Sequence, residues 1–345
     1  MDYFKNKSVL VTGCCGTVGS ELVKQLLETF DVGHLIGIDN NESELFFIQQ
    51  EYQKYEQAGF FLADMRDRAK LTRLFKDVDI VFHSAAFKHV VLCERSPFDA
   101  VQTNIHGVQN VVEAAYDAGV ERVIFTSSDK AVNPTNVMGT SKLMGERLIT
   151  AANNAQRGHK TIFSSTRFGN VLGSRGSVIP IFRDQIKKGG PVTLTDPGMT
   201  RFIMSIQDAT RLVIDSSMIA KGGEVFVTKM PVIKIKDLAE CMIEKLAPMY
   251  GHKPADIDIV TIGSKPGEKL YEELMSSEET RRTCELERYF AVLPAFANMY
   301  EKISYDYEGK ISDTITNPYN SELEPTLSKD ELCAFLTEHK LLEED

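Results

Sequence analysis

The sequence predicts an α/β fold in which a doubly wound parallel sheet is followed by a smaller C-terminal lobe. Short runs rich in β-branched residues alternate with helical stretches in the first half of the chain, a rhythm typical of a parallel sheet covered by helices on both faces. A glycine-rich turn follows the first run, and beyond about Asn170 the alternation gives way to longer loops and isolated helices. We therefore expect residues 1–170 to form the sheet domain and residues 171–345 to form mainly the lobe, with some segments returning to the first domain.

The expected elements follow in chain order from their apolar runs. Six runs predict the strands of the sheet: Ser8 to Val11, Leu35 to Ile38, Phe60 to Leu62, Ile80 to Phe82, Val123 to Thr126 and Thr161 to Ser165. The lobe is expected to contain two helices and two short strands: helices Val178 to Lys188 and Ile206 to Ile219, and strands Val192 to Leu194 and Val225 to Thr228. The tail after Asn317 is acidic, and we expect it to be partly mobile.

Composition limits the class of protein. The chain has 345 residues, 43% of them hydrophobic, which allows one large core or two abutting ones. A formal net charge of -10 argues against nonspecific binding to nucleic acid or to anionic membranes. No apolar run approaches the roughly 20 residues of a membrane helix, and the start leads into a strand rather than a signal peptide. We expect no membrane span and no nucleic-acid partner.

The cysteines indicate the redox environment. Their spacing is not that of a metal site, and a chain of this length does not need disulfides to stabilise its core. We therefore expect no resident metal, no disulfide and a reducing, cytoplasmic location for the six cysteines: Cys14, Cys15, Cys93, Cys241, Cys284 and Cys333.

The glycine-rich turn lies between a strand and a helix, the setting of a dinucleotide-binding fingerprint in a Rossmann-type fold. Its glycines let the backbone approach a pyrophosphate, and the helix N-terminus supplies N–H groups and a favourable dipole. Asp39 ends the second strand 20 residues after the last glycine of the turn and is placed to accept hydrogen bonds from the adenosine ribose. We assign five positions of the turn to the cofactor: Gly13, Gly16, Thr17, Val18 and Gly19.

Asp39 also indicates which cofactor is bound. An acidic side chain repels a 2′-phosphate, and no Arg or Lys lies among residues 40–43, so we expect NAD rather than NADP, with Asn40 in the same site. An alternative role for Asp39 is to cap the helix that begins near Glu42.

Met138 occupies the position at which short-chain dehydrogenases/reductases carry a catalytic tyrosine. Met138 and Lys142 are four residues apart, so on a helix they share one face, as the Tyr and Lys of Tyr-x-x-x-Lys do. A thioether cannot exchange protons. Just upstream an acid and an amine follow an apolar run, in the order Ser127-Ser128-Asp129-Lys130. We expect the proton chemistry to lie there.

These residues resemble one branch of the extended short-chain dehydrogenases/reductases, the UDP-N-acetylglucosamine 4,6-dehydratases of the capsule and glycan biosynthesis type. The resemblance covers nearly the whole chain. It implies a cytoplasmic, homo-oligomeric hydro-lyase that uses NAD and acts on a nucleotide sugar in surface polysaccharide or nonulosonic acid biosynthesis. The stretches that carry it are Ser127 to Lys142, Arg167 to Val171, Ser174 to Ser177, Asp196 to Phe202 and Pro266 to Leu270.

The resemblance implies a role for each residue of the central group. In the related dTDP-glucose dehydratases the strand end reads Thr-Asp-Glu, with the Asp as acid and the Glu as base. By position, Asp129 would protonate the C6 leaving group and neutral Lys130 would take the C5 proton. Asp129 is also our candidate for the C4 hydroxyl proton, with Ser128 holding that hydroxyl. Lys142 would bind the nicotinamide ribose and Met138 would form an apolar wall. The alternative is an ordinary Asp–Lys ion pair at a strand end.

The resemblance also extends the cofactor site. Asp64 and Met65 correspond to adenine contacts, although Asp64 could equally cap a helix. The loop from Ser84 to His89 would pass the nicotinamide, and Asn104 would support it from a helix beneath. The further cofactor contacts are Ala85, Ala86, Lys88, Asn104, Ser127, Lys142 and Arg167.

The substrate site is expected to hold a nucleotide diphosphate. Asn170 would contact the diphosphate, Arg175 and Arg201 would grip phosphate oxygens, and Glu268 would hold the nucleotide ribose or cap a helix. Lys88 and His89 would reach the sugar, although His89 is equally compatible with a structural role. Two further arginines, Arg281 and Arg282, either close over the site or are solvated.

Four functions remain open. The first is a UDP-N-acetylglucosamine 4,6-dehydratase that retains configuration at C5, because family members with methionine in place of the tyrosine look like retaining enzymes. The second is the same reaction on GDP-N-acetylglucosamine, as in relatives that feed legionaminic acid synthesis. A 4-epimerase has no need of an acid at C6, so the Asp129–Lys130 pair argues against it. A non-catalytic NAD-binding regulator would explain the missing tyrosine, but the presence of Lys142 with that pair argues against it.

Overall fold

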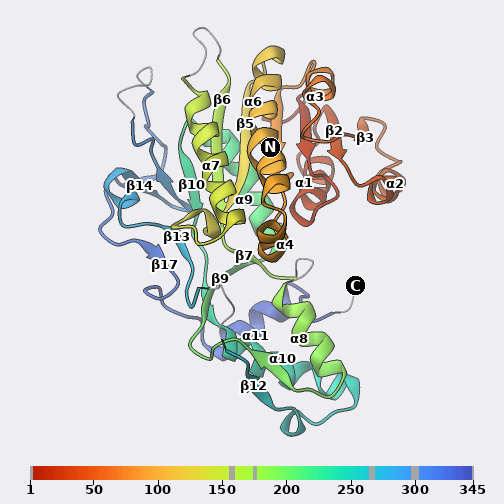
Figure 1. The fold of residues 1–345 in the computed structure, drawn as a ribbon, viewed down its shortest axis with the longest axis vertical. Helices are drawn as coiled ribbons and strands as arrows, with labels where there is room; N and C mark the ends of the chain where they lie inside the picture. Colours follow the sequence, from red (N-terminus) through yellow and green to blue (C-terminus); the bar gives the residue numbers. More distant parts are fainter. Residues whose placement is uncertain (1–2, 155–159, 174–176, 264–268, 297–302, 344–345) are drawn as a thin grey trace. The chain divides into compact units, whose positions relative to one another are not determined.

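The computed structural model describes the chain apart from residues 1–2, 155–159, 174–176, 264–268, 297–302 and 344–345, and Figure 1 shows its elements in the order of the sequence. The chain forms two compact units. Unit 1 consists of Met1–Phe168, Ala209–Lys229 and Met275–Pro318, and unit 2 of Gly169–Asp208, Met230–Leu274 and Tyr319–Asp345.

Unit 1 is built on a ten-stranded sheet with the order β16-β14-β15-β10-β6-β5-β4-β1-β2-β3. The first six strands of the chain are all parallel and lie in the order 3-2-1-4-5-6, which is the Rossmann-type order of a doubly wound sheet. The predicted fold class is therefore confirmed. These strands are β1 (Ser8–Thr12), β2 (His34–Asp39), β3 (Ala58–Leu62), β4 (Ile80–His83), β5 (Arg122–Ser128) and β6 (Ile162–Phe168).

Beyond β6 the sheet is extended by segments from later in the chain. β10 (Val225–Thr228) pairs parallel with β6, and β15 (Tyr289–Val292), β14 (Thr283–Leu286) and β16 (Lys310–Ser312) follow antiparallel. Two elements that were expected in the lobe belong to unit 1 instead: most of the helix Ile206 to Ile219, and the strand Val225 to Thr228. All four residues of this strand are buried, and a short β-branched run shows that a strand forms without showing which sheet it joins.

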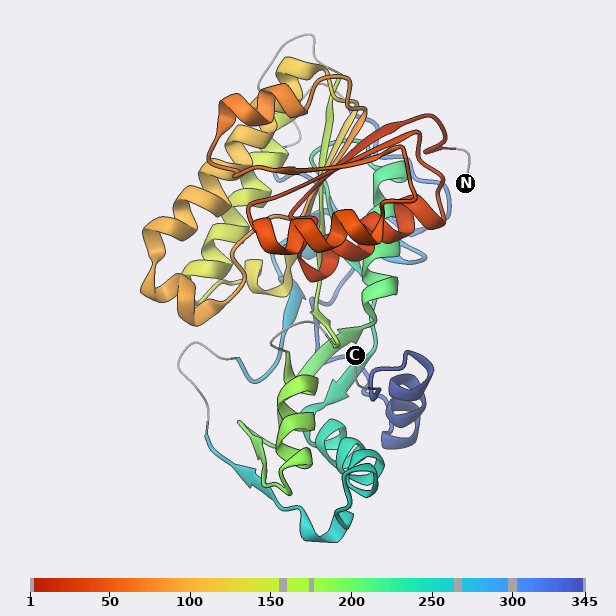
Figure 2. The same cartoon turned by 90° about the vertical axis from the view of Figure 1, so that its right-hand side faces the viewer.

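Helices cover both faces of the unit 1 sheet. Figure 2 shows α6 and α7 on one face and α1 and α9 on the other. The first face is filled by a large apolar core that includes Val81, Val123, Phe125 and Phe163. The helices are α1 (Thr17–Glu28), α2 (Glu42–Glu51), α3 (Arg68–Leu74), α4 (Val90–Arg95), α5 (Pro97–Val101), α6 (Gly107–Ala118), α7 (Val137–Ala152) and α9 (Ile206–Ile219), with a π-helix η1 (Gln102–His106) and the 3-10 helices η2 (Asp129–Ala131) and η5 (Glu279–Arg282).

Unit 2 has its own core, formed by residues from α8, α10, α11 and short strands. Its main sheet has the order β11-β9-β7, and two further strand pairs are β12-β8 and β13-β17. The elements are β7 (Asn170–Val171), α8 (Val178–Lys187), β8 (Val192–Leu194), β9 (Thr200–Met204), β11 (Val232–Lys234), α10 (Ile235–Leu246), η3 (Pro248–Tyr250), η4 (Pro254–Asp256), β12 (Ile259–Thr261), β13 (Glu273–Met275), β17 (Tyr319–Asn320) and α11 (Lys329–Glu338).

Two expectations for the C-terminal part are corrected. The tail after Asn317 was expected to be partly mobile, but α11 begins with a capping box at Ser328 and buries Leu332 and Leu336 completely. Leucines four residues apart lie on one helix face, and that face packs into the unit 2 core. No disulfide was expected, yet Cys241 of α10 and Cys333 of α11 are bonded, because two packed helices bring their thiols together.

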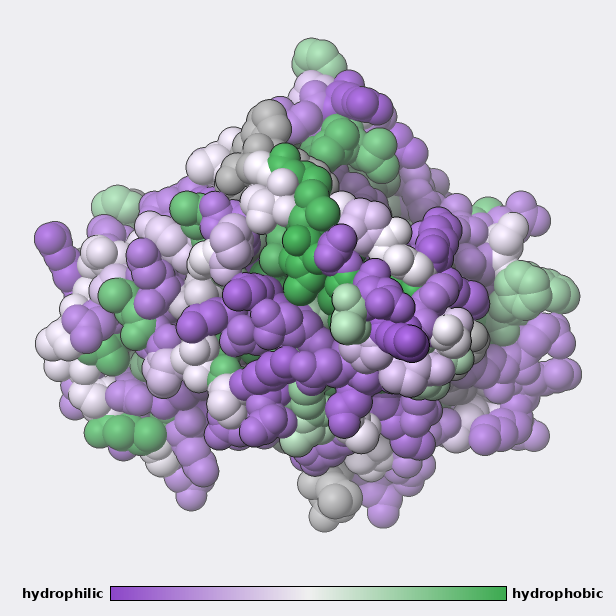
Figure 3. All heavy atoms as spheres, turned by 90° about the horizontal axis from the view of Figure 1, so that it is seen from below, coloured by the Kyte–Doolittle hydropathy of each residue, from purple (hydrophilic) through white to green (hydrophobic). Residues whose placement is uncertain are grey.

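The surface is consistent with a chain of which 26% is charged. The face drawn in Figure 3 is predominantly hydrophilic, with hydrophobic side chains gathered in small patches. Within the described part of the chain, no helix has both the length and the apolar character needed to span a bilayer.

Candidate functional site

The glycine-rich turn joins β1 to α1, and two of its positions, Gly13 and Gly19, have no room for a side chain. Gly13 has φ +69°, and a Cβ atom there would lie 2.7 Å from the Cα atom of Ala85. A Cβ atom on Gly19 would lie 2.0 Å from the carbonyl oxygen of Gly13. The turn therefore packs closely against both the loop after β4 and the first turn of α1. Gly16 precedes α1 and provides no side-chain cap, so the N–H groups of Thr17 and Val18 are available to an anion.

Asp39 lies at the end of β2 beside this turn. Its Oδ2 atom accepts a hydrogen bond from the backbone N–H of Cys15 at 3.1 Å, and its Oδ1 atom accepts one from the N–H of Asn41 at 3.0 Å. The cap of α2 is Asn41, whose Oδ1 atom accepts from the N–H of Glu44. Asp39 therefore does not cap the helix, and its partly exposed carboxylate is held next to the turn.

Asp64 follows β3 at the same edge of the sheet. Its carboxylate pairs at two points with Arg66, at 2.9 and 2.6 Å, and this hydrogen bonding is the main cause that lowers the pKa of Asp64. Asn40 also donates to it, which joins the ends of β2 and β3. The cap of α3 is Asp67 rather than Asp64. Met65 is buried in the core, and its carbonyl accepts a hydrogen bond from Asn110 Nδ2 at 2.8 Å.

The loop after β4 is fixed by a buried asparagine. Asn104, in the π-helix η1, accepts a hydrogen bond from the N–H of Phe87 at 2.8 Å and donates to the Phe87 carbonyl at 3.0 Å. It also donates to Ser141 Oγ of α7 at 2.9 Å. Asn104 thus links this loop to α7. Ala85 and Ala86 lie half-buried in the loop, and Lys88 and His89 are exposed beyond it.

A buried histidine at the end of β4 was missed by the sequence reasoning. His83 Nδ1 lies 2.7 Å from Thr12 Oγ1, and the side chain is fully buried. Burial, with a smaller contribution from Lys142, lowers the pKa of His83 to about 3, so the imidazole is neutral. Thr12 Oγ1 also accepts from the N–H of Ala85 at 3.2 Å. The pair therefore holds β1, β4 and the following loop in register.

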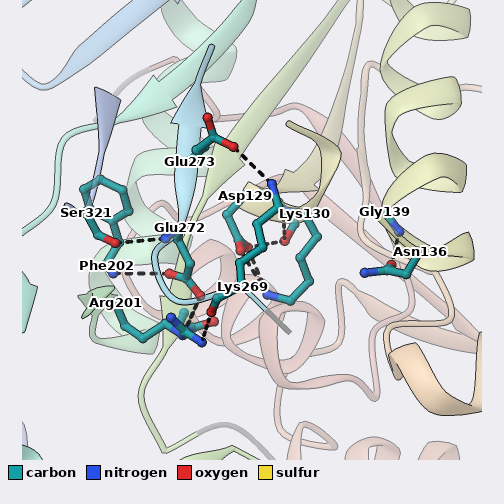
Figure 4. A network of polar contacts seen from close by, with 12 residues as sticks. Asp129, Lys130, Asn136, Gly139, Arg201, Phe202, Lys269, Glu272, Glu273 and Ser321 are labelled. Carbon is teal, nitrogen blue, oxygen red and sulfur yellow. Dashed lines mark hydrogen bonds and ion pairs between the residues drawn. The ribbon is translucent and has the colours of Figure 1, made fainter. Parts of the chain in front are cut away.

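Three polar groups converge at the end of β5. Ser128 Oγ donates to Asp129 Oδ1 at 2.6 Å. Lys130 Nζ donates to both carboxylate oxygens of Asp129, at 3.2 and 3.0 Å (Figure 4). The Asp129 side chain is 5% exposed and that of Lys130 34% exposed. The nearly buried carboxylate of Asp129 is thus paired with the amine of Lys130, which is more exposed to solvent. Ser127, the preceding residue, is buried within the strand.

Helix α7 packs against this turn. Its N-cap is Asn136, whose Oδ1 atom accepts from the N–H of Gly139 at 2.8 Å (Figure 4). A Cβ atom on Gly139 would lie only 2.2 Å from the carbonyl oxygen of Lys130. Glycine at this position therefore allows the helix to approach the Ser-Asp-Lys group.

Met138 and Lys142 both lie in α7, the helix on which their spacing was expected to place them on one face, and both are buried. Met138 packs with Cys93 and Ala100. Lys142 Nζ donates to the Thr126 carbonyl at 2.9 Å, and its burial lowers its pKa to about 8. Lys142 thus lies beneath the end of β5 in a state that is readily deprotonated.

Arg167 is the penultimate residue of β6, and its side chain is enclosed by carboxylates. Its guanidinium is 1% exposed and pairs with Glu146 of α7 at 2.9 and 2.6 Å and with Glu279 of η5 at 3.1 Å to each oxygen. The expectation of a cofactor contact receives no support from this geometry, because two buried carboxylates enclose the side chain. Arg167 ties three segments of unit 1 together.

In unit 2 the predicted residues Asn170 and Arg201 share one carboxylate, that of Glu272. Asn170 Nδ2 donates to Glu272 Oε1 at 2.8 Å, and Arg201 Nε lies 3.3 Å from the same oxygen. Arg201 also donates to the carbonyls of Lys269 and Leu270, and Figure 4 shows this network. Arg201 is buried, so a phosphate could reach it only if this network opened.

Two of the predicted substrate residues, Arg175 and Glu268, lie outside the described residues. Arg282 belongs to unit 1, where it pairs with Glu278 and donates to the Leu293 carbonyl, and Arg281 is exposed beside it. Sequence reasoning missed several residues that organise these sites, and none stands in a motif: His83, Arg66, Glu146, Glu272 and Glu279.

Comparison with known proteins gives a family match over most of the chain. Residues 9–294 match the family described as polysaccharide biosynthesis protein. A UDP-N-acetylglucosamine 4,6-dehydratase (inverting) of Campylobacter jejuni is 39% identical over 293 residues, which cover 85% of this chain and 84% of that protein. A UDP-glucose 4-epimerase of Rickettsia felis is 33% identical over 351 aligned residues, 99% of this chain and 98% of that protein.

A solved structure is similar over almost the full length. The X-ray structure of Pen from Bacillus thuringiensis has 40% sequence identity and a TM-score of 0.90, and the alignment covers 99% of this chain and 100% of that one. The two folds are therefore closely similar.

Proposed function

The chain belongs to the polysaccharide biosynthesis protein family, and on that premise we propose that it is an NAD-dependent nucleotide-sugar 4,6-dehydratase acting on UDP-N-acetylglucosamine. The observation that carries the proposal is the Asp129 carboxylate at the end of β5, with Lys130 and Ser128 both bonded to it. A dehydratase needs an acid for the departing C6 hydroxyl and a base for the C5 hydrogen. An enzyme that only oxidises and reduces C4 does not need this pair.

The cofactor site is supported by residues at the ends of β1 and β2. The crowded Gly13–Gly19 turn and the uncapped start of α1 suit a pyrophosphate, and the Asp39 carboxylate suits the hydroxyls of an unphosphorylated ribose. NAD would supply hydride acceptance at C4 and hydride return at C6. Lys142, buried beneath β5, would hold the second ribose by hydrogen bonds from its ammonium group.

The protein residues would then handle the protons. Asp129 in its acid form gives a proton to the C6 hydroxyl as the C–O bond breaks, and Lys130 in its neutral form takes the proton from C5. In the present structure the side chains of Asp129 and Lys130 form an ion pair, so a sugar that enters the site has to separate them. Separation places the acid near C6 and the amine near C5, and water is eliminated.

A 4-epimerase is the second candidate, because the epimerase of Rickettsia felis matches almost the whole chain. The decisive experiment incubates purified protein and NAD with UDP-N-acetylglucosamine, and separately with GDP-N-acetylglucosamine, in deuterated water. A dehydratase gives a product that has lost water and carries solvent deuterium at C5. An epimerase gives unchanged mass and an inverted C4. An unaltered sugar in both reactions would refute both enzymatic proposals.

The same products report the stereochemistry at C5 by NMR. Met138 in place of a tyrosine motivates the proposal of retention, whereas the name of the Campylobacter jejuni relative specifies inversion for that protein. A product with inverted configuration at C5 would contradict the proposal of retention but not the proposal that the protein is a dehydratase.

Replacement of single side chains tests the roles directly. Asp129→Asn should reduce turnover at least about a hundredfold, because the acid is lost, while NAD affinity is unchanged. Met138→Leu is the matched control: an apolar side chain of similar volume should keep turnover within a few-fold. A Met138→Leu protein that folds and binds NAD but has no turnover would sink this assignment.

A further inference from the structure

Two adjacent cysteines lie in the dinucleotide turn, where neither the fold nor the proposed reaction requires cysteine. Cys14 is buried and Cys15 is partly exposed, and their Sγ atoms are 4.0 Å apart. With a carboxylate oxygen of Asp39, these ligand atoms all lie within 4.8 Å of one another. We propose that Cys14, Cys15 and Asp39 form a binding site for a thiophilic divalent metal ion such as Zn²⁺ or Cd²⁺, and that this ion and NAD exclude each other.

The spacing of the two sulfur atoms fits one ion. Zinc binds thiolates at about 2.3 Å, so two thiolates of a tetrahedral site lie about 3.8 Å apart. The observed 4.0 Å is close to this separation. Binding replaces the two thiol protons, which pass to solvent, and the Asp39 carboxylate supplies the third ligand. The fourth position is left for water, and the partly exposed side of Cys15 gives the ion a route of entry.

A metal ion suits this pair better than a disulfide between the two residues. The Cys14–Cys15 peptide bond is trans, and a trans peptide separates neighbouring Cα atoms by about 3.8 Å. Disulfides usually join Cα atoms about 4.4–6.8 Å apart. The two thiols are therefore near enough to share an ion but too close along the chain for an ordinary disulfide.

The backbone holds all three ligands in place. The N–H groups of Gly13 and Cys14 both donate to the Ile38 carbonyl, at 2.8 and 3.2 Å, which fastens the turn to β2. The Cys15 N–H donates to Asp39 Oδ2 at 3.1 Å. The Cys14 Sγ atom lies against Gly37, where an added Cβ atom would come within 3.1 Å of it. Donors fixed in this way lose little freedom when an ion binds.

The exclusion of NAD follows from Asp39 and rests on the proposed cofactor site. Each carboxylate oxygen already accepts one backbone hydrogen bond, from Cys15 and from Asn41. The two lone pairs that remain are the acceptors available to the two ribose hydroxyls, and a metal ion bound to Asp39 removes at least one of them. The ion with its water ligand would also occupy the space in which the ribose has to lie.

Cobalt is a suitable probe, because thiolate ligands give Co²⁺ a strong near-ultraviolet charge-transfer band. NAD-free protein is titrated with Co²⁺ and, in competition, with Cd²⁺. We expect the band in the wild type and in Cys284→Ala, which removes a buried thiol of β14. Cys15→Ser should lower the metal affinity at least about tenfold. Because Cys15 contacts Asp39 through its backbone, this variant should keep its fold and that hydrogen bond, and Cys14→Ala serves as a second ligand deletion.

Competition completes the test. NAD at ten times its own Kd should raise the apparent Kd of Cd²⁺ about tenfold. The proposal is overturned if both ligand deletions bind Co²⁺ as the wild type does, or if NAD leaves the affinity for Cd²⁺ unchanged. Metal binding is read without turnover, so a protein that binds the ion through Cys15 but never dehydrates a sugar would refute the proposed reaction and support the metal site.

Discussion

Lys142 shows how one buried residue can be ready for its proposed role. Its ammonium nitrogen has the Thr126 carbonyl at 2.9 Å and the ring of Phe125 at 4.7 Å. Burial disfavours the charged form and lowers the pKa from the ordinary 10.5 to about 8, although Glu146 acts in the opposite direction. At neutral pH the lysine is therefore charged, at a cost in stability.

The sign of the Lys142 effect leads to a test by pH. Between about pH 8 and 10.5 the folded state binds fewer protons at this site than the unfolded state, so its contribution to stability rises with pH there. Below pH 8 the full cost applies, about 3 kcal/mol. Lys142→Met should therefore be stabilised relative to wild type most at pH 7, and the difference should shrink towards pH 10.5. Urea unfolding at several pH values measures this.

A lysine on the surface provides the control for that experiment. Lys24 is exposed on α1, and Lys24→Met should differ from the wild type by the same amount at every pH. If the Lys142→Met difference is equally constant, the lowered pKa does not exist.

The lowered pKa of Glu279 reflects a stabilised charged form, in contrast to that of Lys142, because Glu279 pairs with the buried guanidinium of Arg167. Burial alone would raise its pKa, but the charge of Arg167 and its hydrogen bonds prevail and lower it to about 2. The stability this carboxylate contributes is present above its ordinary value of 4.5 and is lost as the pH falls from 4.5 towards 2.

Glu279→Gln should therefore cost about 3 kcal/mol at pH 7, since one partner of a buried ion pair is removed. The cost should diminish below pH 4.5. The matched control is Glu278→Gln, an exposed neighbour that pairs with Arg282 and should cost less than about 1 kcal/mol. An equal loss in both variants would show that the Arg167 cluster does not stabilise unit 1 in this way.

At the scale of elements, the site depends on how closely α7 approaches the end of β5. The helix can come this close because Gly139 presents no side chain to the Lys130 carbonyl. Asn136 caps the N-terminus of the helix three residues before Gly139. The helix then brings Lys142 beneath the strand, while η2 turns Asp129 and Lys130 towards each other. The contact between α7 and the η2 turn therefore brings Lys142 close to the end of the strand that carries Asp129 and Lys130.

Gly139→Ala tests this contact. The added Cβ atom would lie 2.2 Å from a backbone oxygen, so the helix and the turn have to separate. We expect a loss of about 1–3 kcal/mol in stability and of at least tenfold in turnover. Met144→Ala, on the exposed side of α7, should change neither. Thermal unfolding and the sugar assay measure both effects, and a Gly139→Ala enzyme with normal turnover would show that the close approach is not needed.

At the scale of the whole molecule, the chain is divided between two units with separate cores. The glycine turn, Asp39 and the Asp129 group belong to unit 1, and the Asn170–Glu272–Arg201 network belongs to unit 2. Unit 2 also contains the disulfide between Cys241 and Cys333, whose cysteines are 92 residues apart in sequence.

This disulfide predicts a selective effect of reduction. Closing a long loop restricts the unfolded chain, and its loss typically costs about 2–5 kcal/mol. Dithiothreitol should therefore lower the unfolding temperature of unit 2 while NAD binding by unit 1 persists. Cys333→Ser should unfold at the lower temperature with or without the reductant. An unfolding temperature that is insensitive to reduction in the wild type would show that the bond does not stabilise unit 2.

The sequence by itself determined the features that depend on local pattern. The parallel strands, the glycine turn followed by Asp39, and the helix that carries Met138 and Lys142 four residues apart were all predicted, because periodicity and spacing act over a few residues. The adjacency of Ser128, Asp129 and Lys130 was also visible, although their mutual hydrogen bonds were not.

Only the tertiary structure decided which distant groups meet. Arg167 lies three residues before the predicted substrate contact Asn170, yet its environment is set by Glu146 and Glu279, which come from other segments. The pairing of β10 with β6, the burial of α11 and the Cys241–Cys333 bond likewise depend on packing between elements far apart in sequence. Such contacts are selected by the shape and charge of the assembled core, which no local pattern records.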